Sequence, residues 1–135
     1  FPRHFLEIGM IGLGKMGMGM AQRLQRDGHG VVGFARSAGT RARAQEQGIE
    51  PADSIEALAH VLQRPRALWM MVPAGDVVDQ TLAVLSPLLS QGDTIIDGGI
   101  TNYKDTQRRG KLLSEKEIDY IDCGTSGGVW GVEHG

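Results

Sequence analysis

The stretch Gly12-Leu13-Gly14-Lys15-Met16-Gly17 decides the fold of this chain. It follows an apolar run at residues 6–11, which is typical of a buried strand, and it opens a helical pattern that begins near Met16 and ends at Gly28. In that context the first glycine allows a tight turn, the second lets the backbone approach a pyrophosphate, and the third lets helix and strand pack closely. The helix N-terminus then favours phosphate binding. We therefore predict that Gly12, Leu13, Gly14, Lys15, Met16 and Gly17 bind a dinucleotide, although the Lys15 side chain could equally point to solvent.

Composition limits the other classes of function. The chain has 135 residues, a formal net charge of −2 and one cysteine, Cys123. The charge argues against a nucleic-acid or anionic membrane surface, and one cysteine excludes an internal disulfide and indicates no zinc cluster. No apolar run reaches 18 residues. We therefore expect a cytoplasmic protein without a metal, a nucleic-acid partner or a membrane partner.

The rest of the chain alternates between continuous apolar runs, which are typical of buried strands, and the spacing of apolar residues that is typical of helices. Apolar runs at residues 31–35, 67–72, 94–97 and 119–123, and a marginal one at 49–52, predict strands. Helical patterns lie between them at about residues 40–47, 54–64, 76–89 and 102–116, with Ser54 and Asp76 as expected N-caps and a bend or restart before Pro87. This alternation predicts an α/β fold: a doubly wound parallel sheet (Rossmann fold) of about six strands in the order 3-2-1-4-5-6, with helices on both faces.

The ends of the chain suggest a fragment. It begins at Phe1 and stops at Gly135 within a glycine-rich stretch. We expect one dinucleotide-binding domain over residues 1–135, in which residues 1–5 are disordered or foreign to the natural sequence. Residues 124–135 would then lead to a further domain, and their apolar side chains at Val129, Trp130 and Val132 would promote association.

The residues after the second predicted strand, Ala35-Arg36-Ser37, indicate the type of dinucleotide. An Asp or Glu at this place normally binds the ribose 2′-OH of NAD, whereas an arginine accommodates the 2′-phosphate of NADP. No acid is present, so the pattern favours NADP, with NAD as the alternative. Arg41 could support the phosphate contact, but Arg41 and Arg43 could equally form a solvated helix face.

Several further motifs together resemble one family. They are Met71-Val72-Pro73-Ala74-Gly75, Asp97-Gly98-Gly99 and Asp122-Cys123-Gly124-Thr125-Ser126-Gly127-Gly128-Val129-Trp130-Gly131. With the glycine turn they resemble the β-hydroxyacid dehydrogenases and, among them, the short form of the 6-phosphogluconate dehydrogenases (decarboxylating). The resemblance implies oxidation of 6-phosphogluconate with NADP or NAD and loss of CO₂ to give ribulose 5-phosphate, a reaction of the pentose phosphate pathway.

The resemblance also implies roles for matching residues. Ala35-Arg36-Ser37 matches the Asn-Arg-Thr of NADP-dependent members, Val72, Pro73 and Ala74 would line the nicotinamide side, and Thr101, Ser126, Gly127 and Gly128 would bind substrate. Ile100 stands where the family carries an asparagine and cannot make its hydrogen bonds, so the substrate stays open. Asn102 could replace that asparagine only if the backbone shifted.

The family's catalytic lysine and glutamate have no match before Gly135. We therefore expect no catalytic residue in this chain, and cofactor binding without turnover. Asp97 and Asp122 are expected to have structural roles. The resemblance further implies a sugar-acid phosphate as substrate and a homodimer of the full-length protein. Two alternatives stay open. One is another β-hydroxyacid dehydrogenase, acting on 3-hydroxyisobutyrate, or an imine reductase; the other is a non-catalytic dinucleotide-sensing module.

Overall fold

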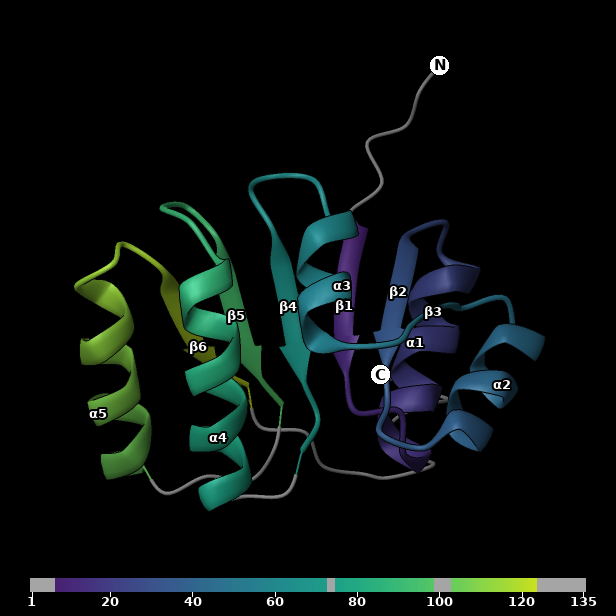
Figure 1. The fold of residues 1–135 in the computed structure, drawn as a ribbon, viewed down its shortest axis with the longest axis horizontal. Helices are drawn as coiled ribbons and strands as arrows, with labels where there is room; N and C mark the ends of the chain where they lie inside the picture. Colours follow the sequence, from purple (N-terminus) through teal and green to yellow (C-terminus); the bar gives the residue numbers. More distant parts are fainter. Residues whose placement is uncertain (1–6, 73–74, 99–102, 124–135) are drawn as a thin grey trace.

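The computed structural model describes residues 7–72, 75–98 and 103–123, without the side chains of residues 15, 16 and 103. Within these ranges six parallel strands form one sheet in the order β3-β2-β1-β4-β5-β6 (Figure 1). The strands are β1 (Glu7–Ile11), β2 (Gly30–Phe34), β3 (Glu50–Ala52), β4 (Ala67–Met70), β5 (Thr94–Asp97) and β6 (Asp119–Asp122). The predicted strand order and parallel direction are confirmed. The expectations for residues 1–5 and 124–135 lie outside the described residues.

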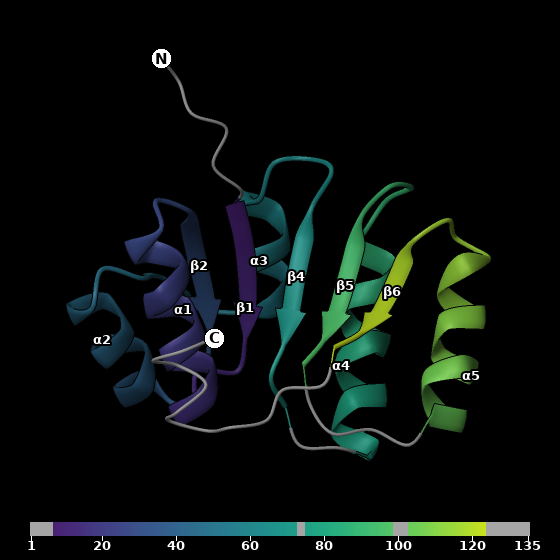
Figure 2. The same cartoon turned by 180° about the vertical axis from the view of Figure 1, so that it is seen from behind.

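Helices cover both faces of this sheet. They are α1 (Lys15–Arg26), α2 (Ala38–Glu46), α3 (Ile55–Val61), α4 (Asp76–Leu85), the short 3₁₀ helix η1 (Ser86–Leu88) and α5 (Tyr103–Ser114). Helices α1 and α2 lie on one face, and α3, α4 and α5 lie on the other (Figures 1 and 2). This division follows from right-handed crossovers that start from the middle of the sheet in both directions.

The central strands are apolar because helices bury them on both sides. One core lies between the sheet and α3, α4 and α5, and contains Leu58, Leu68, Leu82 and Ile95. The other lies under α1 and α2 and is built around Met10, Ala21, Ala44 and Ile49. Met18, Met20 and Leu24 of α1 pack on the second core, so the methionine side chains that the structure describes in this helix are part of the hydrophobic packing.

Two helix starts differ from the sequence prediction. The second helix begins at Ala38 because Ser37 is its N-cap, with the Ser37 hydroxyl accepting a hydrogen bond from the Thr40 N–H at 3.4 Å. The predicted N-cap Asp76 is wrong: Gly75 occupies that position with φ 94°, and Asp76 is the first helical residue. Ser54 is confirmed as the N-cap of α3, since its hydroxyl accepts a bond from the Ala57 N–H at 3.0 Å. The restart before Pro87 is also confirmed, because α4 ends at Leu85 and η1 follows.

Candidate dinucleotide-binding site

The turn between β1 and α1 is held against the ends of the two neighbouring strands. Gly12 donates its N–H to the Phe34 carbonyl of β2 at 2.9 Å and has φ 97°, a conformation that favours glycine. Any Cβ at Gly12 would overlap the Met71 carbonyl oxygen beyond β4. The first glycine of the motif therefore makes a tight turn that passes directly over the adjacent strand end.

The other two glycines of the motif have opposite surroundings. A Cβ at Gly17 would overlap the Gly12 carbonyl oxygen, so this glycine lets α1 pack against the turn. A Cβ at Gly14 would meet no atom within 4 Å. Gly14 is the N-cap of α1, and no side chain caps the helix there. The exposed side of Gly14 and the uncapped helix start are what an approaching pyrophosphate requires.

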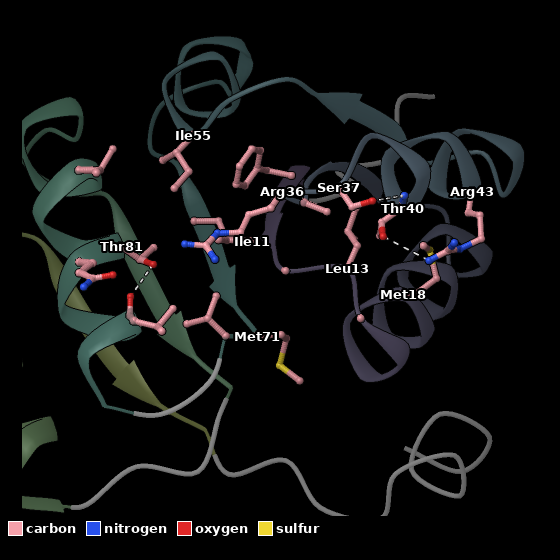
Figure 3. A pocket seen from close by; sticks show the side chains of 18 residues that line it. Ile11, Leu13, Met18, Arg36, Ser37, Thr40, Arg43, Ile55, Met71 and Thr81 are labelled. Carbon is pink, nitrogen blue, oxygen red and sulfur yellow. Dashed lines mark hydrogen bonds between the residues drawn. The ribbon is translucent and has the colours of Figure 1, made fainter.

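A cavity of about 880 Å³ opens at the carboxyl ends of β1, β2 and β4 (Figure 3). This volume lies within the range of small-molecule sites, about 300–1,000 Å³. Most of its lining residues come from four places in the fold. They are Gly12, Leu13 and Gly14 of the glycine turn; Ala35, Arg36 and Ser37 after β2; Met71 and Val72 after β4; and Ile55, Val77, Gln80, Thr81 and Val84 of helices α3 and α4. Seven residues predicted to bind the cofactor (Gly12, Leu13, Gly14, Ala35, Arg36, Ser37 and Val72) thus lie in one cavity.

The charge of this cavity is positive at the end of β2. Among the described residues that line it there is no Asp or Glu, and two arginines, Arg36 and Arg43, are present. The Arg36 side chain extends from the end of β2 toward the side of the cavity formed by α4 (Figure 3). An anionic group placed beside Arg36 would meet a cation and no repelling carboxylate.

Arg41 and Arg43 have different roles although both belong to α2. Arg41 Nη1 donates to the carbonyl oxygens of Ala35 at 2.6 Å and Arg36 at 3.1 Å, so Arg41 closes the turn after β2 and does not line the cavity. Arg43 does line the cavity, and its Nη2 donates to Thr40 Oγ1 at 3.2 Å. Arg43 is therefore the second cation on the cavity wall, and the phosphate contact suggested for Arg41 stays a prediction. The sequence does contain a signal for the role of Arg43. Arg43 is spaced three residues from Thr40 and six from Ser37, a spacing that places side chains on one helix face.

Among the remaining predicted site residues, Gly17 is described and does not line the cavity, and the others lie partly or wholly outside the described part of the chain. The side chains of Lys15 and Met16 are not described, nor are residues 73–74, 99–102 and 124–135. The roles of Pro73, Ala74, Thr101, Ser126, Gly127 and Gly128 therefore stay predictions. In the described ranges, no helix is long and apolar enough to cross a membrane, and no three His, Cys, Asp or Glu side chains are grouped to hold a metal ion.

Asp97 ends β5 with its side chain fully buried. Its carboxylate accepts a hydrogen bond from the Tyr120 hydroxyl at 2.7 Å. Burial and the neighbouring Asp97 carboxylate both raise the pKa of Tyr120, so the phenol stays protonated and keeps donating. This arrangement agrees with the structural role expected for Asp97.

Comparison with known proteins decides the family of this chain. The family described as the NAD binding domain of 6-phosphogluconate dehydrogenase matches residues 7–135. The chain belongs to this family. The expectation of a nicotinamide dinucleotide as cofactor and the suggested resemblance are therefore confirmed.

Individual relatives agree with the family but extend well beyond this chain. A 6-phosphogluconate dehydrogenase of Haloferax volcanii, named NAD(+)-dependent and decarboxylating, is 44% identical over 130 residues, which are 96% of this chain and 42% of the relative. The chain thus spans less than half the length of that protein.

Solved structures share the fold. The 6-phosphogluconate dehydrogenase of Plasmodium falciparum, solved in its apo form and with NADP+ and 6-phosphogluconate, has a TM-score of 0.84 and 32% identity, covering 93% of this chain and 28% of that one. A 3-hydroxyisobutyrate dehydrogenase from Salmonella typhimurium has a TM-score of 0.82 and 26% identity, covering 91% and 43% of the two chains. The similarity to dehydrogenases of both kinds leaves the substrate open.

Proposed function

We propose that this chain is the NADP-binding domain of a 6-phosphogluconate dehydrogenase-like oxidoreductase. The observation that carries the choice of NADP is the cavity wall formed by the end of β2 and by α2, where Arg36 and Arg43 respectively are present and no described lining residue is acidic. A 2′-phosphate carries up to two negative charges, so it gains from two nearby cations, whereas the 2′-OH of NAD gains little and finds no carboxylate to bind it.

Each part of the cavity would bind a different part of the cofactor. The α1 N-terminus and the open side of Gly14 would face the pyrophosphate. Arg36 and Arg43 would bind the 2′-phosphate. The apolar side chains of Ile55 and Val84 would contact the adenine ring. When bound, NADP supplies the hydride acceptor, while these residues hold and orient it.

The reaction we propose for the whole protein is oxidative decarboxylation of 6-phosphogluconate to ribulose 5-phosphate. Family membership supports this reaction. The Haloferax volcanii relative extends well beyond the matched region, and we propose that such additional parts complete the site. Acid–base groups would come from those parts, the substrate would be a sugar-acid phosphate, and the protein would act as a homodimer in the cytoplasm. Ile100 favours a second candidate, a dehydrogenase for a different hydroxy acid such as 3-hydroxyisobutyrate, because an isoleucine cannot hydrogen-bond a sugar hydroxyl.

Titration of the chain with NADP and with NAD at one fixed salt concentration tests the cofactor assignment. We expect tighter binding of NADP, and a loss of at least about tenfold in NADP affinity in Arg36→Ala with NAD affinity unchanged, since one charge-assisted hydrogen bond contributes about 1.5–3 kcal/mol. Arg43→Ala should show a smaller loss of the same kind.

The control for this titration is Arg26→Ala, because Arg26 is an exposed cation in the last turn of α1, away from the cavity. It should change neither affinity by more than about twofold. Equal affinities for the two dinucleotides in the unaltered chain, or a preference for NAD, would refute the role of Arg36 and the choice of NADP.

A further inference from the structure

Arg109 of α5 is a buried cation that joins separate elements on the carboxyl-end side of the sheet. Its side chain is 2% exposed. Arg109 Nε donates to Asp79 Oδ1 at 2.9 Å, and its Nη2 donates to Asp79 Oδ2 at 3.3 Å and to the Gly75 carbonyl oxygen at 3.4 Å. Asp79 lies in the first turn of α4, and Gly75 is the N-cap of that helix. Arg109 therefore ties α5 to the start of α4, where the connection from β4 ends.

A second polar pair lies near this guanidinium, between β6 and β5. Tyr120 of β6 donates its hydroxyl to the buried Asp97 carboxylate, and Arg109 lies near enough to that hydroxyl to lower the pKa of Tyr120 against the larger rise from burial. We refer to Asp79, Arg109, Tyr120 and Asp97 as the Arg109 series. Its first two members join α4 to α5, and its last two join β5 to β6.

General stability does not account well for a buried arginine at this place. Removing a guanidinium from water is costly, and an apolar side chain of similar volume is often equally stabilising. Arg109 Nη1 is buried and has no hydrogen-bond partner among the described residues, which adds to that cost. What Arg109 supplies that an apolar residue could not is the bond to Gly75, which has φ 94° and no side-chain cap.

The neighbouring Arg108 provides the contrast. Its Nη2 also lies 3.2 Å from both Asp79 carboxylate oxygens, but its side chain is 48% exposed and it has no described bond to Gly75. An exposed pair of this kind contributes about 0–1 kcal/mol. The two adjacent arginines therefore share one carboxylate. Among the described bonds, Arg109 rather than Arg108 also donates to a backbone carbonyl at the start of α4, that of Gly75.

We propose that Arg109 is a positioning residue for the nicotinamide half of the cofactor. This inference rests on the proposed function. In a doubly wound sheet the ligand lies across the carboxyl ends of the strands, with one mononucleotide on each half. The residues for the adenosine half, among them Arg36 and Gly14, follow β2 and β1, whereas Gly75 follows β4 and Asp97 is the last residue of β5. The Arg109 series thus bears on the second half of the site, whereas Gly14, Arg36 and Arg43, which would bind the phosphates of the first half, lie on other elements.

The test compares two ligands that share the adenosine half. Adenosine 2′,5′-bisphosphate carries the 2′-phosphate and lacks the nicotinamide, whereas NADP carries both. For the unaltered chain we expect NADP to bind more tightly. In Arg109→Gln that advantage should fall about tenfold, as expected for a lost set of charge-assisted bonds, while the Kd of adenosine 2′,5′-bisphosphate changes less than about twofold.

Two further variants keep the result interpretable. Arg109→Lys keeps the charge beside Asp79 but cannot reach both Asp79 and Gly75, so it should stay folded in circular dichroism and still lose the advantage of NADP. Arg108→Gln, the matched control, should keep it. This difference between ligands is a readout that a merely structural role would not produce.

Three outcomes would overturn the inference. An equal loss of affinity for both ligands in folded Arg109→Lys would show that Arg109 only supports the fold. Equal binding of the two ligands by the unaltered chain would show that the second half of the site contributes nothing, while leaving the phosphate site intact. Binding of neither ligand by the unaltered chain would refute the proposed function itself, and the inference with it.

Discussion

Gly17→Ala is expected to lower the free energy of unfolding by about 2 kcal/mol and to abolish measurable NADP binding. The new methyl group would overlap the Gly12 carbonyl oxygen, and Gly12 cannot move away because its N–H is bonded to Phe34 and its φ is 97°. Alanine favours a helix over glycine by about 1 kcal/mol, but overpacking against backbone costs about 3 kcal/mol, so the clash dominates. Thermal unfolding followed by circular dichroism measures the first effect, and titration with NADP measures the second.

Gly14→Ala is the matched control for Gly17→Ala. A Cβ at Gly14 meets nothing within 4 Å, and its φ of −68° suits alanine, so stability should change by less than about 0.5 kcal/mol. The added methyl group would nevertheless occupy the space through which the pyrophosphate approaches, so NADP affinity should fall at least about tenfold. Normal NADP binding by Gly14→Ala would refute the placement of the pyrophosphate, and normal stability of Gly17→Ala would refute the packing argument.

The fold could be predicted from the sequence because local and global signals agree. Continuous apolar runs, glycine at helix ends and helical spacing between them leave few arrangements other than a doubly wound parallel sheet. The strand order followed from the glycine motif, since only the first strand of this sheet carries it. The errors were local. Asp76 is predicted as the α4 cap because a sequence does not show that Gly75 adopts φ 94° and is itself the N-cap.

The candidate site was predicted less completely, for a physical reason. Arg36 follows a strand end directly, so its position in the cavity could be inferred from the strand alone. Arg41 and Arg43 are two residues apart on one helix and point to different sides, so only the helix orientation separates a turn-closing arginine from one that lines the cavity. The role of Arg109 could not be predicted for the same reason. Its partners Asp79 and Gly75 are about 30 residues away in the chain, and a single sequence does not show that such distant residues meet.

Asp93→Asn is expected to destabilise the fold by about 3–5 kcal/mol, because it removes a fully buried charge from a set of donors. Asp93 Oδ1 accepts from the Arg66 N–H at 2.7 Å, and Oδ2 accepts from the Ser90 N–H at 2.8 Å and lies 3.4 Å from Arg66 Nη1. An asparagine would turn its NH₂ group toward one of these donors and would leave the Arg66 guanidinium, only 9% exposed, without its counter-charge.

The position of Asp93 makes this effect separable from cofactor binding. Asp93 and Arg66 precede β5 and β4, at the amino ends of these strands, whereas the cavity lies at the carboxyl ends. Below its lowered melting temperature, Asp93→Asn should therefore bind NADP with unchanged affinity. Asp27→Asn is the matched control, since Asp27 forms an exposed pair with Arg23 at 3.7 Å and its loss should cost at most about 0.5 kcal/mol. If urea denaturation gave the two variants equal stability, the Asp93–Arg66 pair would contribute no more than a surface pair, and backbone hydrogen bonds and apolar packing would suffice to hold the amino ends of β4 and β5 together.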